Sequence, residues 1–168
     1  MSTNETPQEA AMHAQPQKEH RWLEKLLGEW VIEAEAAEPG KAPEKGTGVE
    51  TVRSLGGLWV VAEGRHQMQG QDGLSIMTLG YDPAKGRYIG TWIGSMMTNL
   101  WVYDGALDAA GRVLTLDTEG PAMDGQGTAR YQDIIEFIAD DHRMLRSQVL
   151  APDGQWQQFM EARYRRKV

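Results

Sequence analysis

Apolar and polar residues alternate through most of the chain after Gly28. In residues 29–37, Trp30, Ile32 and Ala34 would share one face of a strand, while the glutamates between them face the other way. No long stretch in this region has the helical period of an amphipathic helix, which argues against βαβ units. The pattern therefore predicts strands joined by turns.

Glycine-rich turn signals divide this region into ten predicted strands. Most successive signals lie farther apart than the roughly 8–12 residues usual in a β-sandwich. Long strands joined by short hairpins favour strands that tilt across the wall of a barrel. The predicted strands cover residues 29–37, 47–55, 58–69, 74–82, 87–95, 98–106, 112–119, 127–139, 142–151 and 155–166.

These strands predict an all-β fold, an antiparallel up-and-down barrel of about ten strands, lipocalin-like and closed so that no long edge is exposed. A short helix over about residues 19–27 precedes them. Its apolar stripe of Leu23, Leu26 and Leu27 needs a surface to pack against. We expect this helix to plug one end of the barrel.

The first 18 residues have no apolar period and predict a disordered tail, which leaves residues 19–168 as one barrel domain. The chain has no cysteine, so disulfides and thiolate metal sites are excluded. It contains neither the apolar core of a signal peptide nor a run near the roughly 20 apolar residues that span a membrane. We expect a cytoplasmic protein without a membrane partner.

The formal net charge is −7, with 24 acidic and 17 basic residues. Non-specific nucleic-acid binding needs a basic surface. The composition therefore predicts no nucleic-acid partner.

The residues at 28–30 form a Gly-Glu-Trp motif that resembles the G-x-W signature of the calycins, the lipocalin-like barrels. The resemblance implies that Trp30 lies across the barrel floor and that an arginine of the last strand packs over it. Arg163, Arg165 and Arg166 lie where that arginine would come from. We expect Arg165 to make the contact, since it follows a tyrosine in a Y-R-R-K ending.

Four segments in order also resemble a bacterial family of unknown function with this barrel. They are residues 20–30, the Gly-Tyr-Asp at 80–82, the Trp-Ile-Gly-Ser-Met at 92–96 and the Tyr-Arg-Arg-Lys at 164–167. The family often has an aspartate where Gly94 stands, so any role of that carboxylate is absent here. The resemblance implies the barrel but no activity, because a fold does not fix a function.

The segment from Tyr88 to Tyr103 is the richest in aromatic and small residues. Glycines at 90 and 94 alternate with Tyr88 and Trp92 on one strand face, which predicts a groove where a ligand could touch backbone. Ligand pockets are mostly apolar with few polar groups, as this segment is. The alternative is that these residues are simply the core of the barrel.

His66 shares a strand face with small and apolar residues. It is either a wall histidine with a local hydrogen bond or a polar anchor in a pocket, where it could also ligate haem. The residues predicted to line a ligand pocket are His66, Met77, Trp92, Met97, Trp101 and Tyr103.

The leading hypothesis is a carrier or sensor that binds a small apolar or amphipathic molecule inside the barrel. It predicts no catalytic residue, no metal site and no cofactor. One alternative is a haem-binding or acid/base enzyme in the same barrel, with His66 as the haem ligand or a carboxylate pair such as Asp117 and Glu119. Another is a homo-oligomeric interaction module, for example a homodimer, whose aromatic residues form the interface.

Overall fold

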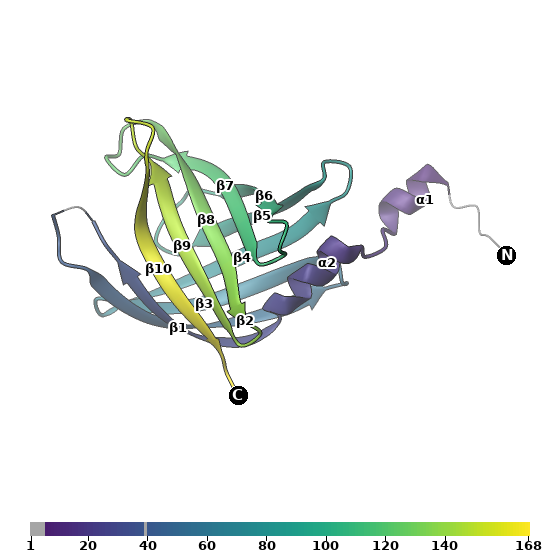
Figure 1. Ribbon diagram of the computed structural model, residues 1–168, viewed down its shortest axis with the longest axis horizontal. Helices are drawn as coiled ribbons and strands as arrows, with labels where there is room; N and C mark the ends of the chain where they lie inside the picture. The colour runs from purple at the N-terminus through teal and green to yellow at the C-terminus, as the bar shows by residue number, and fades with distance from the viewer. Residues whose placement is uncertain (1–5, 39) are drawn as a thin grey trace.

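The computed structural model describes residues 6–38 and 40–168, and it is an all-β barrel with short helices before it (Figure 1). The predictions that fall on residues 1–5 and on Pro39 lie outside the described residues. Ten strands form one closed sheet in the order β1-β10-β9-β8-β7-β6-β5-β4-β3-β2. Every pair of neighbouring strands is antiparallel, and the closing pair joins β1 to β10 through a register that includes Trp30 opposite Arg166. The predicted up-and-down barrel of about ten strands is confirmed.

The strands are β1 Gly28–Ala36, β2 Glu44–Leu55, β3 Trp59–Met68, β4 Gln71–Asp82, β5 Arg87–Gly94, β6 Trp101–Leu107, β7 Val113–Pro121, β8 Thr128–Ala139, β9 His142–Leu150 and β10 Trp156–Arg166. Two of them begin three residues earlier than predicted, β2 at Glu44 and β4 at Gln71, because backbone pairing continues past the point where the apolar alternation fades. In contrast, β6 begins three residues later, at Trp101, since its ladder with β5 ends at the pair of Trp92 and Trp101.

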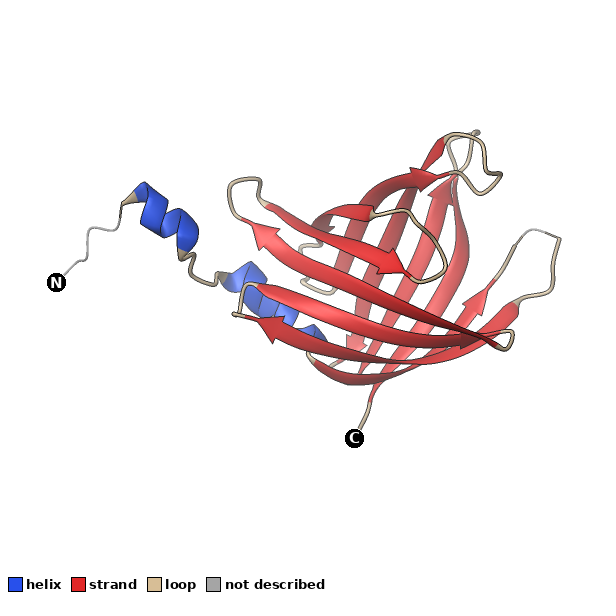
Figure 2. Ribbon diagram, turned by 180° about the vertical axis from the view of Figure 1, so that it is seen from behind, coloured by secondary structure: helices blue, strands red, loops and turns tan. Residues whose placement is uncertain are grey.

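A helical plug covers one end of the barrel, as predicted (Figure 2). It consists of α2, Lys18–Leu23, and the 3-10 turn η1, Glu24–Leu26. Leu23 and Leu26 are buried in the core, and the ring of Trp22 meets those of Tyr88 and Phe137 edge to face. The indole nitrogen of Trp22 donates a 2.7 Å hydrogen bond to the carbonyl of Gly111, which fastens the plug to the turn between β6 and β7.

The segment expected to be a disordered tail contains a helix, α1, Pro7–Met12. Proline fits the first helical turn, and the glutamate, alanine and methionine residues after it are good helix formers, so a short helix forms without an apolar stripe. The side chains of Pro7 and Met12 are exposed. That the tail contributes little to the barrel stays a prediction.

Burial along the inner face divides the barrel into two halves. The closed half is the end that carries the plug, where Trp30, Ile32 and Tyr88 are buried. Farther along the same strands, inward-facing Ala34 and Trp92 are partly exposed. We call this second end the open half, because its interior is accessible to solvent.

Candidate functional site

Trp30 is buried in the closed half, next to the plug. It is 1% exposed, and its indole nitrogen donates a 2.8 Å hydrogen bond to the carbonyl of Leu26 in the plug. The guanidinium carbon of Arg166 lies 4.2 Å from its ring centroid, at cation–π distance. The choice of Arg165 is wrong: Arg165 is exposed and stands opposite Val31 on the outer face, because successive strand residues point to opposite faces.

Arg143 on β9 is a second arginine over Trp30, and no motif in the sequence marks it. Its guanidinium carbon lies 4.6 Å from the Trp30 ring and 3.9 Å from the Tyr164 ring. One terminal nitrogen donates to the carboxylate of Glu50, and the two side chains are only 4% and 12% exposed. This is a buried ion pair. Ninety-three positions separate its partners, so no local pattern in the sequence could have found it.

Asp133 on β8 places a second carboxylate inside the barrel. It accepts hydrogen bonds from the hydroxyl of Tyr103 and, at 2.5 Å, from the hydroxyl of Ser147. Burial raises the pKa of the Asp133 carboxyl, and the two hydrogen bonds oppose the rise. Burial likewise raises the pKa of Tyr103 well above its ordinary value, and the neighbouring Asp133 adds to the rise.

His66 lies against the wall of the barrel. Its Nε2 is 2.9 Å from the hydroxyl of Ser75 on β4. A Cβ placed on Gly64 would lie 2.6 Å from Nε2, and one placed on Gly48 would lie 3.0 Å from Nδ1. The imidazole ring can lie this close to the backbone of β2 and β3 because Gly48 and Gly64 have no side chains. Burial lowers the pKa of His66, although nearby Glu50 opposes this.

The predicted pocket residues come together on the open-half wall with one exception. Met77, Trp92 and Trp101 form a row across β4, β5 and β6, each opposite the next in the register. Tyr103, the next inward residue of β6, is buried. Met97 instead belongs to the exposed connection between β5 and β6, where its sulfur accepts a 3.1 Å hydrogen bond from the indole nitrogen of Trp101.

The groove predicted at Gly90 and Gly94 is absent. A Cβ on Gly94 would lie 2.4 Å from the ring of Trp92 and 2.5 Å from the sulfur of Met96, so side chains already cover this glycine. At Gly90 a Cβ would lie 1.9 Å from the carbonyl oxygen of Thr78 on the neighbouring strand. These glycines permit close packing within the wall.

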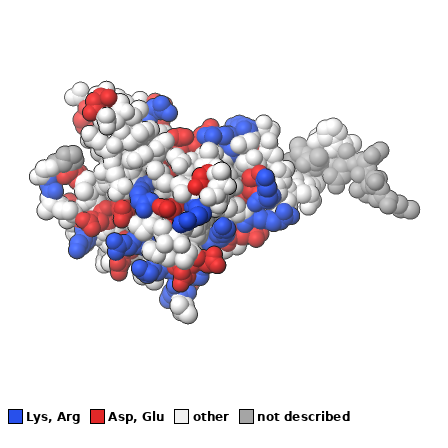
Figure 3. Space-filling model, viewed as in Figure 1, with Lys and Arg blue, Asp and Glu red and all other residues white. Residues whose placement is uncertain are grey.

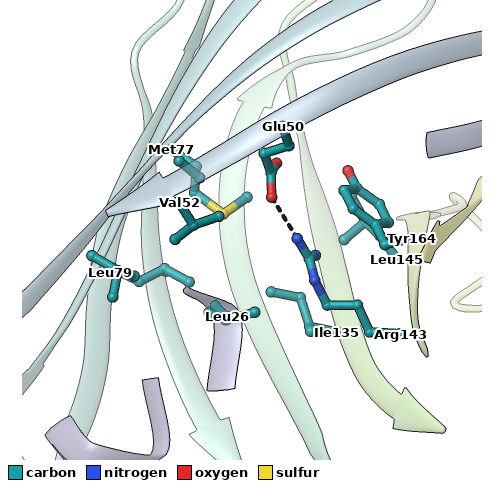
Figure 4. Close-up of a pocket in the computed structure, with 11 residues that line it drawn as sticks. Leu26, Glu50, Val52, Met77, Leu79, Ile135, Arg143, Leu145 and Tyr164 are labelled. Atoms are coloured by element: carbon teal, nitrogen blue, oxygen red, sulfur yellow. Dashed lines mark hydrogen bonds and ion pairs between the residues drawn. The ribbon is translucent and has the colours of Figure 1, made fainter. Parts of the chain in front are cut away.

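A small cavity of about 20 Å³ lies in the middle of the barrel, between the plug and the buried ion pair (Figure 4). It is bordered by Leu26, Met77, Arg143 and Tyr164, among others. This volume suits a single water molecule. A much larger open cleft of about 500 Å³ lies between β1, β2 and β10, with Met160 among the residues that line it.

Eight inward-facing polar or aromatic-hydroxyl residues form what we call the polar layer. Its members influence one another: the charge of Glu50 acts on His66, and the charges of Glu50, Arg143 and Asp133 all act on Tyr164. The polar layer consists of Glu50, His66, Ser75, Tyr103, Asp133, Arg143, Ser147 and Tyr164.

The carboxylate pair of Asp117 and Glu119 belongs to the outer wall. Asp117 accepts a 2.8 Å hydrogen bond from the side chain of Gln132, and Glu119 accepts one of 3.0 Å from Thr128. In the part of the chain that the structure describes, no group of three His, Asp or Glu side chains could hold a metal ion. No helix within residues 6–38 and 40–168 is long and apolar enough to cross a membrane.

The fold and this interior define a class, a closed ten-strand barrel with a polar layer inside. Residues 15–166 match the model of a protein family of unknown function, DUF1579, and the chain belongs to that family. The predicted resemblance to a family of unknown function with this barrel is thereby confirmed.

Two solved structures share the fold at low sequence identity. The chain is similar to Rv2717c from M. tuberculosis, with 15% identity, a TM-score of 0.62, and coverage of 92% of this chain and 100% of that one. It is also similar to the S-type phycobiliprotein lyase CPES from Guillardia theta, with 14% identity, a TM-score of 0.59, and coverage of 91% and 99%. No curated protein matches the sequence significantly.

Proposed function

We propose that the protein binds a small amphipathic molecule in the open half of its barrel and acts as a carrier or sensor without catalysis. The difference between the closed half and the open half of the interior is the main support for this proposal. The closed half is a packed apolar core, whereas the open half combines a solvent-accessible apolar wall with polar groups at its floor. Ligand sites commonly pair an apolar wall with a few fixed polar groups.

The apolar part of the ligand would lie against the row of Met77, Trp92 and Trp101. Methionine side chains adapt to varied shapes, and Met160 adds another at the mouth. The 20 Å³ cavity is too small for anything but water, so the ligand would enter from the open half with its polar end toward the polar layer.

Two observations bear on the alternative functions. The ring nitrogens of His66 are turned to Ser75 and to the backbone of β2, which argues against their use as haem ligands. Figure 3 shows acidic and basic side chains interspersed over the visible face, and together with the net charge of −7 this supports the absence of a nucleic-acid partner. The contact of Arg166 with Trp30 supports the calycin resemblance. The cytoplasmic location and the homodimer stay predictions.

The neutral dye N-phenyl-1-naphthylamine tests the proposal, because its fluorescence rises when it enters an apolar site. We expect binding at micromolar concentration, with energy transfer from Trp92 and Trp101. Replacing Trp101 by Leu should weaken binding several-fold. The control is Trp59→Leu on the outer wall, where Trp59 packs over Gly80; it should leave binding unchanged.

Absence of dye binding by folded protein would overturn the proposal, and so would equal weakening by the two substitutions. The aromatic residues would then be plain core, and light scattering would show whether the protein is instead a homo-oligomeric module. An absorption spectrum of the purified protein tests the haem alternative, which predicts a Soret band.

A further inference from the structure

The polar layer has more negatively charged groups than positively charged ones. It contains two carboxylates, Glu50 and Asp133, but only one guanidinium, that of Arg143. Glu50 takes this guanidinium in a buried ion pair. Within the described part of the chain, Asp133 receives hydrogen bonds only from the neutral hydroxyls of Tyr103 and Ser147. Among the described residues, Asp133 has no ion-pair partner.

The remaining interior arginine does not reach Asp133. Arg166 packs on Trp30 and donates its hydrogen bonds to the backbone carbonyls of Leu27, Lys25 and Asp140 at the closed end. The pKa of the Asp133 carboxyl is raised by burial, as expected for a carboxylate that lacks a nearby cation.

Arg143 also offers no site for an anion. Its Nε is buried and has no hydrogen-bond partner among the described residues. The Arg143 side chain, however, borders the 20 Å³ cavity. A single water in that cavity could accept its hydrogen bond. The charge of the guanidinium is meanwhile compensated by Glu50 (Figure 4).

On the basis of the proposed function, we infer that the polar end of the ligand is an ammonium or another N–H donor, and that the site discriminates against a carboxylate. Each carboxylate oxygen accepts more than one hydrogen bond, so Asp133 can take an N–H donor without losing Tyr103 or Ser147. A carboxylate ligand would instead bring a third negative charge beside Glu50 and Asp133, where the low dielectric of the interior strengthens repulsion.

Three probes with the same twelve-carbon chain test this inference: dodecylamine, dodecanol and dodecanoate. Dodecylamine and dodecanoate are used below their micelle concentrations, and dodecanol below its solubility limit, to displace N-phenyl-1-naphthylamine from the wild-type protein at pH 7.5. We expect dodecylamine to bind about tenfold more tightly than dodecanol, as a charge-assisted hydrogen bond allows, and dodecanoate to bind most weakly.

The variant Asp133→Asn keeps the shape of the side chain and removes its charge. It should abolish the advantage of dodecylamine over dodecanol, since dodecanol has no charge to pair with the carboxylate. The matched control is Asp117→Asn on the outer wall, which should preserve the wild-type ranking. Circular dichroism checks that both variants fold.

The outcomes separate this inference from the proposed function. If none of the three probes displaces the dye, binding in the open half fails altogether. If dodecanol binds but dodecylamine has no advantage, or dodecanoate binds most tightly, the inference about the polar end is overturned and the binding site stands. A dodecylamine preference that survives in folded Asp133→Asn overturns it as well. The wild-type ranking decides the matter even where the variant does not fold.

Discussion

The closed and open halves of the barrel are built from the same ten strands, yet they differ in what their inner faces do. In the closed half, Leu23, Leu114 and Leu116 are almost completely buried and pack into one apolar cluster. In the open half, Trp92 and Trp101 stay partly exposed above the polar layer. The comparison indicates that the barrel separates stability, which the plugged end provides, from the proposed site, which lies at the end where no helix of the described residues covers the lumen.

Replacing Trp30 by Ala should have the largest effect on stability, because it opens a cavity in the closed half and removes the surface on which Arg143 and Arg166 stack. We expect a loss of about 4–5 kcal/mol in the free energy of unfolding, measured by urea denaturation. Trp92→Ala in the open half is the matched substitution and should cost clearly less, because Trp92 is partly exposed already. Equal losses would contradict the division into halves.

Replacing Arg143 by Met should cost about 3–4 kcal/mol, because it leaves the carboxylate of Glu50 buried without its partner. Adding Glu50→Gln to this variant should recover most of the loss, since the unpaired charge is then gone. Thermal and urea unfolding of the two single variants and the double variant form the required cycle. A double variant as unstable as Arg143→Met alone would show that the ion pair is not what holds these side chains.

Asp133→Asn should raise the free energy of unfolding at neutral pH. We expect this gain to be smaller than the loss caused by Arg143→Met. Burial raises the pKa of this carboxyl, so the folded protein holds the proton more tightly than the unfolded chain. The wild-type protein therefore loses stability as the pH rises from the unfolded-state value of about 4 through the folded-state value. Melting temperatures should be measured from pH 3.5 to 7.5. The melting temperature of the variant should rise relative to that of the wild type as the pH rises. A gap that is constant with pH would contradict this.

Deleting residues 2–15 should have the smallest effect, a change of less than about 2 °C in melting temperature, because the sequence of this segment has no apolar stripe to bury. The deletion stops before Gln17, whose backbone nitrogen donates a 2.9 Å hydrogen bond to Nδ1 of His20 at the start of the plug. Extending the deletion through Gln17 should therefore cost more. A large drop for the shorter deletion would show that the tail packs on the barrel.

Local patterns in the sequence were enough for much of the architecture. Alternation of apolar residues defined the strands, the leucine stripe defined the plug, and the Gly-Glu-Trp motif marked Trp30 as a residue that the structure buries. Each of these features depends on residues within one strand or one helical turn. The phase of the last strand was less well determined, because Arg165 and Arg166 are equally polar and neither marks the inner face.

The polar layer could only come from the tertiary structure. Asp133 and Glu50 lie at inward positions where an apolar pattern predicts hydrophobic residues, so the rule that finds the inner face passes over them. Arg143 lies 93 positions from Glu50 and Tyr103 lies 30 positions from Asp133, whereas Ser147 lies on the next strand along the chain. The alternation of residues along one strand determines which side chains share a face of that strand. Closure of the barrel determines which side chains of different strands come into contact inside it. The sequence therefore determined the barrel and its plug, and the way the closed sheet brings these side chains together determined the chemistry of its interior.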